Sequence, residues 1–266
     1  MRGNAPSRLG RLGPRIIVLL YLAALLLVPT GLIFYRTFES GIGPVIDSVT
    51  TPAAISAFWL TVEIAVIAVP LNTILGVTTA LALARGRFRG KALLEAVIDL
   101  PFAVSPVVIG LSLVLVYGRS GWIDLPFQVI FSVPGMVLAT IFVSLPFVVR
   151  EVTPVLREVG DEPEQAAATL GASRWQAFWR ITLPAIRYGI AYGVVLCTAR
   201  SIGEFGAVSV VSGKISGETQ SLTLLVEQRF GDFDLAGAYA ASALLALIAL
   251  ATLLIMTRVR PRKDQA

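Results

Sequence analysis

Long apolar stretches alternate with short polar segments along the chain. A helix that crosses a bilayer needs about 20 predominantly apolar residues. Six stretches come close enough to this length to predict membrane-spanning helices: residues 16–34, 58–84, 92–117, 133–149, 188–211 and 236–257. The pattern predicts an all-α polytopic membrane protein. Residues 16–257 would form one transmembrane domain between a basic segment, 1–15, and a short tail, 258–266.

Two predicted spans contain residues that favour irregular structure or close packing. Pro101 and Pro106 should bend the third span, because proline removes a backbone donor and its ring clashes with the preceding turn. Asp99 precedes them, where it either bonds to nearby backbone donors or lines the inner mouth of a path. In the fifth span, Gly189 and Gly193 have the spacing that lets a second helix approach closely.

A polar, amphipathic insert at residues 160–184 separates the fourth and fifth spans. Asp161 and Glu164 have the spacing of a capping box, in which each side chain bonds to a backbone N–H at the start of a helix. The alanines at 166–168 favour that helix, and Gly171 favours a left-handed residue just after its end. We therefore expect a short first helix that ends at a glycine turn.

A second short helix is predicted directly after this turn. Ser173 and Gln176 repeat the capping signal, and Pro184 should end the helix. Three aromatic residues lie on it: Trp175, Phe178 and Trp179. Two short helices with aromatic side chains suit a docking element for another protein, and the same pattern also suits a helical loop that lies on its own bundle.

The composition excludes most soluble and enzymatic classes. Apolar residues make up 56% of the 266 residues and charged residues 15%, with a mean hydropathy of +0.79, whereas soluble domains carry about 25% charged residues. Cys197 is the sole cysteine and histidine is absent, which excludes disulfides, cysteine-based metal sites and histidine-dependent catalysis within the chain. We assign no catalytic and no metal-binding residue. The basic segment 86–91 lacks the spacing of a phosphate-binding loop, so energy from ATP would have to come from a partner.

The basic residues are distributed as topology signals, which argues against nucleic-acid binding. With a cytoplasmic N-terminus, cytoplasmic segments hold 17 Lys and Arg residues and external segments hold 4. The cytoplasmic ones lie in segments 1–15, 85–91, 150–187 and 258–263. This excess predicts that both termini and the insert are cytoplasmic. The external segment 212–235 includes an apolar run, 222–226, which predicts a short helix or strand at the outer surface.

Arg200 and Glu204 are charged residues within the predicted fifth span. A charge at this depth costs about 2.5 to 3.5 kcal/mol on insertion scales and needs an explanation. Residues four apart share a helix face, and Arg200 lies about 18 Å along the span, near the centre of a bilayer core about 30 Å thick. The pair either faces a translocation path, where Arg200 can meet an oxyanion, or forms a purely structural ion pair.

Seven positions of the insert resemble the cytoplasmic loop signature of ABC importer permeases, E-A-A-x3-G-x9-I-x-L-P. They are Gln165, Ala166, Ala167, Gly171, Ile181, Leu183 and Pro184. Gln165 departs from the usual Glu, although Glu164 lies next to it. The resemblance implies a type I permease fold, in which loop 150–187 carries a coupling helix, about 162–170, that fits a cleft on an ATPase subunit. The seven positions, with Glu162 and Glu164, are the expected ATPase-coupling residues.

Residues 199–213 and 98–108 resemble the sulfate/thiosulfate importer permeases of the W type. Molybdate permeases share the core at 200–206 and usually differ after it. The resemblance implies a bacterial inner-membrane complex with a second homologous permease, two ATPase subunits that hold ATP and Mg, and an external sulfate-binding protein. This chain would need no cofactor of its own, and Arg200 and Glu204 are its expected pathway residues.

Other functional classes explain less of the sequence. A molybdate or tungstate permease is the nearest alternative. An ion-coupled secondary transporter would have to use Glu63, Asp99 and Glu204 for coupling, and it would leave the insert at 160–184 unexplained. An intramembrane enzyme lacks a recognisable catalytic setting.

Overall fold

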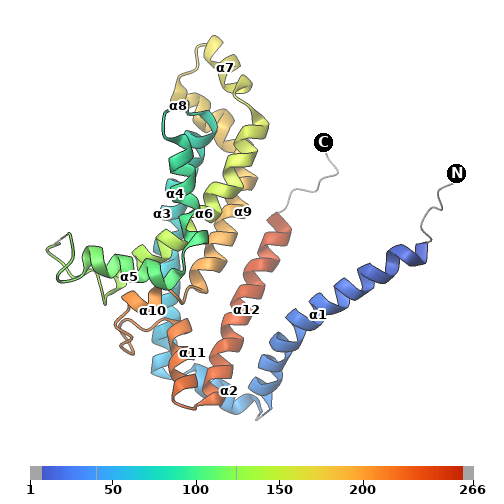
Figure 1. The fold of residues 1–266 in the computed structure, drawn as a ribbon, viewed down its shortest axis with the longest axis vertical. Coiled ribbons are helices and arrows are strands. Elements are labelled where there is room, and N and C mark those ends of the chain that lie inside the picture. Colours follow the sequence, from blue (N-terminus) through green and yellow to red (C-terminus); the bar gives the residue numbers. More distant parts are fainter. Residues whose placement is uncertain (1–7, 40, 124, 260–266) are drawn as a thin grey trace.

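The computed structural model describes residues 8–39, 41–123 and 125–259, so segments 1–7 and 260–266 of the predicted basic segment and tail lie outside the described residues. The described residues are largely helical, which confirms the all-α prediction (Figure 1). The elements are α1 Arg8–Phe38, α2 Ile42–Val49, α3 Pro52–Arg85, α4 Lys91–Ala103, α5 Pro106–Tyr117, α6 Val133–Val159, α7 Glu162–Thr169, α8 Arg174–Ala177, the π-helical segment η1 Phe178–Thr182, α9 Leu183–Ile202, α10 Val208–Val211, α11 Leu222–Gly231 and α12 Leu235–Val259.

Within the described residues, five helices are long and apolar enough to cross a bilayer. They are Arg15–Phe38, Pro52–Arg85, Val133–Val159, Arg174–Ile202 and Leu235–Thr252. The consecutive helices α4 and α5 pass the same test as a bent pair and would bring the number to six. The prediction of about six spans therefore agrees with the structure when this pair is taken as one broken span.

The predicted bend in the third span, residues 92–117, is confirmed, and it is a complete break between two helices. α4 and α5 are bent by 114° at a short break between them. Pro101 lies inside α4 without ending it, whereas Pro106 begins α5. A residue that precedes proline disfavours the helical conformation, and Ser105 accordingly has an extended ψ of 135°. The second proline therefore breaks the span, and α5 projects sideways from the bundle (Figure 1).

The helices that contain the fourth and fifth predicted spans end at other residues than those spans. α6 continues beyond residue 149 to Val159, so the predicted cytoplasmic loop begins inside a helix. α9 ends at Ile202 instead of residue 211, and the short helix α10 follows separately. Between them Gly206 packs on α5, where a Cβ on Gly206 would lie 2.9 Å from the Pro106 Cβ. This packing between distant segments gives a physical reason for the early end of α9.

The apolar run at residues 222–226 belongs to α11, which resolves the predicted choice between helix and strand. Leu222, Leu224 and Leu225 of this helix are buried within the chain, and its placement on the external side of the membrane stays a prediction. These leucines pack within the chain, and Leu222 and Leu225 meet Ala54 and Ala57 of α3.

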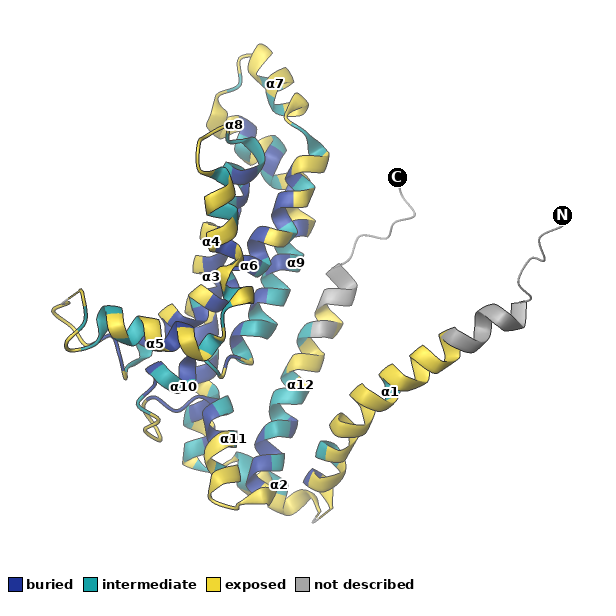
Figure 2. Ribbon diagram, viewed as in Figure 1, coloured by how far each residue is buried: buried dark blue, intermediate teal, exposed yellow. Residues whose placement is uncertain are grey.

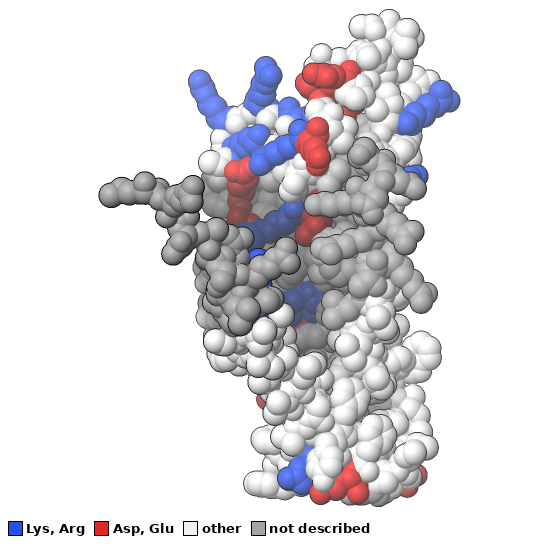
Figure 3. Space-filling model, turned by 90° about the vertical axis from the view of Figure 1, so that its right-hand side faces the viewer, with Lys and Arg blue, Asp and Glu red and all other residues white. Residues whose placement is uncertain are grey.

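α3, α6 and α9 run side by side as the centre of the bundle (Figure 1). α7 and α8 lie at one end of it, and α2 and α11 lie at the other. α12 packs along α9 and α11. α1 diverges from the bundle, and its described side chains are almost all exposed (Figure 2). On the face drawn in Figure 3, charged side chains gather at the end where α7 and α8 lie.

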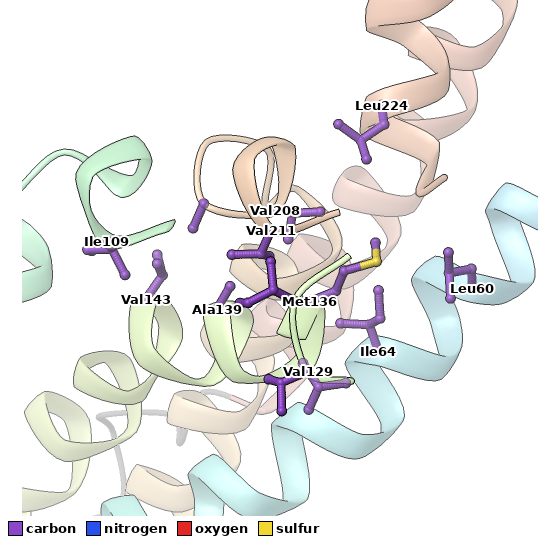
Figure 4. Packing of buried hydrophobic residues seen from close by; sticks show 13 residues of the cluster. Leu60, Ile64, Ile109, Val129, Met136, Ala139, Val143, Val208, Val211 and Leu224 are labelled. Atoms are coloured by element: carbon purple, nitrogen blue, oxygen red, sulfur yellow. The ribbon is translucent and has the colours of Figure 1, made fainter. Parts of the chain in front are cut away.

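The two largest groups of buried apolar side chains among the described residues lie inside the bundle. The first fills the space where α3, α5, α6, α10 and α11 meet (Figure 4) and includes Met136, Val143 and Leu224. The second joins α3, α6 and α9 around Val152 and Ile186. Because lipid is itself apolar, close packing rather than transfer from water favours these contacts.

The predicted close helix approach at Gly189 and Gly193 is confirmed. A Cβ on Gly189 would lie 3.1 Å from the Glu151 carbonyl oxygen, and one on Gly193 would lie 3.1 Å from the Val148 Cα. Both neighbours belong to α6. Glycine at these positions therefore lets α9 pack against the backbone of α6.

Candidate functional site

The predicted insert forms α7 and α8 at one end of the bundle, joined by the predicted glycine turn (Figure 1). Gly171 has a φ of +84°. Its N–H donates to the Ala168 carbonyl at 3.0 Å, and the N–H of Ala172 donates to the Ala167 carbonyl at 3.0 Å. These two bonds form a Schellman motif, which satisfies carbonyls that the helix end leaves unpaired.

The two predicted capping boxes have different outcomes. The second is confirmed: the Ser173 N–H donates to Gln176 Oε1 at 2.9 Å, and the Gln176 N–H donates to Ser173 Oγ at 3.3 Å. The first is wrong, because the Asp161 side chain accepts no capping hydrogen bond. Its carboxylate instead accepts a bond from Gln165 Nε2 at 2.8 Å. The Glu164 side chain turns toward α3 and η1 and is not available to the helix start.

The second helix of the insert does not stop before Pro184, which corrects the prediction. α8, η1 and α9 continue as one helix of 29 residues, Arg174–Ile202. Pro184 lies in the first turn of α9, directly after the π-helical segment. A wider π-helical turn is a known way to accommodate a proline that lacks a donor and crowds the preceding turn. The second helix of the insert, α8, is thereby continuous with a membrane-spanning helix.

The predicted coupling positions divide between the surface and the base of the loop. Glu162, Gln165, Ala166, Gly171 and Pro184 are exposed, and Glu164, Ala167, Ile181 and Leu183 are half-buried. Sequence reasoning missed Leu170, which is 88% exposed at the end of α7 beside the glycine turn. The sequence signal for it is a leucine directly before the glycine that ends a predicted docking helix.

The three aromatic residues of the second helix form one cluster. The Trp175 ring stacks on Phe178 at 6.1 Å and meets Trp179 edge-on at 5.5 Å between centroids. Trp175 and Trp179 are 68% and 50% exposed. The aromatic surface beside α7 is therefore large and available for contact with another molecule.

Arg200 and Glu204 form the predicted ion pair, with Arg200 Nη2 lying 2.5 Å from Glu204 Oε2. They do not share a helix face, because α9 ends at Ile202. Glu204 is held by the turn instead: its Oε1 accepts the Ala207 N–H at 2.8 Å, and its carbonyl accepts from Thr223 Oγ1 at 2.9 Å. Glu204 is almost fully buried, whereas the Arg200 side chain remains 29% exposed. The arginine is thus the accessible member of the pair.

A buried polar cluster near this pair was not predicted. Asn72 of α3 is fully buried and donates from Nδ2 to Ser144 Oγ of α6 at 2.8 Å and to Cys197 Sγ of α9 at 3.6 Å. Ser201 of α9 bonds to the same Ser144 hydroxyl at 3.3 Å. These bonds link the three central helices, as polar residues do between membrane helices. An asparagine within an apolar span is the sequence signal for such a contact.

Asp99 does not bond to nearby backbone donors, the first of its two predicted roles, and its second role, lining the inner mouth of a path, stays a prediction. Its carboxylate pairs with Arg150 of α6 at 2.9 Å, and a second pair, Glu95 with Arg157, joins the same two helices at 2.9 Å. Both pairs border a groove between α4 and α6. Among the described residues, no group of three or more His, Cys, Asp or Glu side chains is placed to hold a metal ion.

The sequence of this chain matches a known family over most of its length. The family is described as "Binding-protein-dependent transport system inner membrane component", and its match covers residues 72–265. The chain belongs to this family. The resemblance inferred from the loop signature is therefore confirmed.

Individual members of the family are also similar over most of the chain. The sulfate transport system permease protein CysW of Synechocystis sp. (strain PCC 6803) is 52% identical over 244 residues, which cover 90% of this chain and 88% of that protein. The protein of the same name in Escherichia coli (strain K12) is 49% identical over 253 residues, covering 93% of this chain and 87% of that one.

A solved structure shows the same fold. The crystal structure of a bacterial ABC transporter involved in alginate import superposes with a TM-score of 0.76, at 19% identity, over 93% of this chain and 92% of its own. At this identity the likeness establishes the fold alone, which is that of an ABC importer permease. Together with the matched family and the two permease relatives, this fold identifies the chain as a multi-pass permease subunit of an ABC importer, and it is a transport subunit rather than an enzyme.

Proposed function

We propose that this chain is the membrane-spanning permease subunit of an ATP-driven sulfate/thiosulfate importer. The substrate assignment is supported by the names of the relatives at 52% and 49% identity, which are sulfate transport permeases. It is further supported by the resemblance of residues 98–108 and 199–213 to permeases of this substrate class.

The observation that carries the proposal is the helical continuity between the signature loop and Arg200. The loop exposes α7 and the glycine turn at one end of the bundle, and its second helix continues without interruption to Ile202. Arg200 lies in the last turn of that same helix. An ATPase subunit that binds the loop would therefore move the helix that carries the charged pair.

We assign contact with the ATPase to the coupling loop and contact with the anion to the charged pair. Exposed Glu162, Gln165, Ala166 and Gly171 form the docking surface. A guanidinium presents paired donors that match an oxyanion, so Arg200 is the group for sulfate. Glu204 neutralises part of that charge, which favours the weak, transient contact that transport requires. ATP and Mg would be held by the ATPase partner.

The surface that this chain leaves uncovered supports the presence of further partners. The most apolar stretch of α1, 18 residues long, has no residue that is buried within the chain. Lipid or a second homologous permease must therefore cover it. The complex would include this second permease, two ATPase subunits and an external sulfate-binding protein. The excess of Lys and Arg in the coupling loop, the segment 1–15 and the tail 258–266 supports a cytoplasmic location for all three, in a bacterial inner membrane.

Uptake by the reconstituted complex tests the proposal. Proteoliposomes that contain this chain with its permease, ATPase and binding-protein partners should accumulate radiolabelled sulfate only when ATP is supplied, and thiosulfate should compete. Molybdate should enter far more slowly than sulfate. Faster molybdate uptake would overturn the substrate assignment, and sulfate uptake without the ATPase subunits would indicate a secondary transporter.

A further inference from the structure

Arg85, the last residue of α3, binds the end of a different helix. Its Nη1 donates to the Leu156 carbonyl at 2.9 Å, and its Nη2 donates to the Gly160 carbonyl. Leu156 lies in the last turn of α6, and Gly160 directly follows that helix. The last four carbonyls of a helix have no partner within it, and an arginine near the helix end can satisfy them.

The same guanidinium also holds α7. Arg85 Nη2 lies 3.3 Å from Glu164 Oε1, and that oxygen accepts a hydrogen bond from Thr182 Oγ1 of η1 at 2.7 Å. The Arg85 and Glu164 side chains are only 22% and 27% exposed, so this contact is half-shielded from water. One arginine and one glutamate thus connect the ends of α3 and α6 with α7 and η1.

α7 has few other attachments that would fix its direction. It is flanked by Gly160 at φ +69° and Gly171 at φ +84°, and glycine rotates more freely than any other residue. The helix has eight residues, and none of them is fully buried. Its orientation therefore depends strongly on the side-chain contact of Glu164.

We propose that Arg85 is a positioning residue that locks α7 against the ends of α3, α6 and η1, so that force applied to α7 reaches the membrane-spanning helices. This inference rests on the proposed function of the loop as the ATPase contact. Without the lock, α7 would stay docked to its partner and rotate about its flanking glycines. ATP would then be hydrolysed with little movement of the bundle.

The variants distinguish the loss of the Arg85 contacts from misfolding of the chain and from loss of ATPase binding. Arg85→Gln removes all three contacts, whereas Glu164→Gln leaves the bonds from Arg85 to α6 in place. Arg87→Gln is the matched control, because it removes the same charge from an exposed residue that has no hydrogen bond or ion pair among the described residues. Arg85→Lys keeps the charge but replaces the planar guanidinium, whose two terminal nitrogens bind different partners, by a single nitrogen.

The first measurement is the amount of sulfate moved per ATP hydrolysed in the reconstituted complex. We expect Arg85→Gln and Glu164→Gln to hydrolyse ATP and to lower this ratio about ten-fold, Arg85→Lys to be intermediate, and Arg87→Gln to match wild type. The double variant Arg85→Gln/Glu164→Gln should lose no more than Arg85→Gln alone, because both act on one contact. An unchanged ratio in either single variant overturns the proposal. A further loss in the double variant shows that Glu164 acts on the ATPase instead, which also overturns it.

The second measurement does not depend on the substrate. Spin labels on cysteines at exposed Ala168 and Thr78 report the distance between α7 and α3 in the full complex. The distance distribution should be narrow in wild type and Arg87→Gln, and broad in Arg85→Gln and Glu164→Gln. Equal distributions overturn the lock even if sulfate is transported. A broad distribution in a complex whose wild type moves no sulfate supports the lock and contradicts only the proposed substrate.

Discussion

Gly76 of α3 lies directly against Val148 of α6: a Cβ on Gly76 would stand 2.6 Å from the Val148 Cγ1. Val148 is fully buried, and Gly193 of α9 also approaches its backbone. The β-branched side chain has few alternative rotamers in a helix. The close spacing of the central helices therefore requires glycine, which has no side chain, at residue 76.

Gly76→Ala should destabilise the complex. Overpacking a filled interior typically costs about 1 to 3 kcal/mol, so the thermal unfolding temperature of the purified complex should fall. Gly231→Ala is the control, since nothing lies within 4 Å of a Cβ at that position. Equal melting temperatures for the two variants would show that Val148 moves aside at little cost.

Gly171→Val should abolish sulfate uptake while the protein still inserts into the membrane. The added side chain meets nothing within 4 Å, so the effect comes from the backbone, whose φ of +84° is unfavourable for a β-branched residue. Gly171→Asn is the matched control, because asparagine tolerates the left-handed conformation and should retain most uptake. Normal sulfate-dependent growth of the valine variant would contradict the role of this turn.

Arg200→Ala should reduce sulfate uptake at least ten-fold while the ATPase subunit still co-purifies. Loss of Arg200 also leaves the buried Glu204 carboxylate without its ion-pair partner, which is destabilising by roughly 3 to 5 kcal/mol in such settings. Arg200→Lys separates the two effects, because it keeps the charge and changes the shape of the donor. If the lysine variant loses the ATPase subunit, Arg200 has a structural role.

The correct predictions rest on signals within a few residues of each other. Gly171 ends α7 and Ser173 caps α8 as the sequence indicates, because both effects arise within one turn of helix. Several of the wrong ones depend on partners that are distant in sequence. Glu164 fits a capping box by spacing, yet Arg85, far away in sequence, binds it. The buried contacts of Asn72 likewise involve three helices, and a linear pattern carries no information about which helices are neighbours.

The helix from Arg174 to Ile202 is long and uninterrupted. The coupling loop adjoins one of its ends, and the pair of Arg200 and Glu204 lies at the other. Arg174 and Arg200 are separated by about 39 Å at 1.5 Å per residue, so a tilt of about 5° at one tip displaces the other by about 3 Å. That displacement exceeds the separation of the Arg200 and Glu204 charges. A small tilt of this helix, caused by a movement of the coupling loop, would thus be enough to present the Arg200 guanidinium to an anion or to withdraw it.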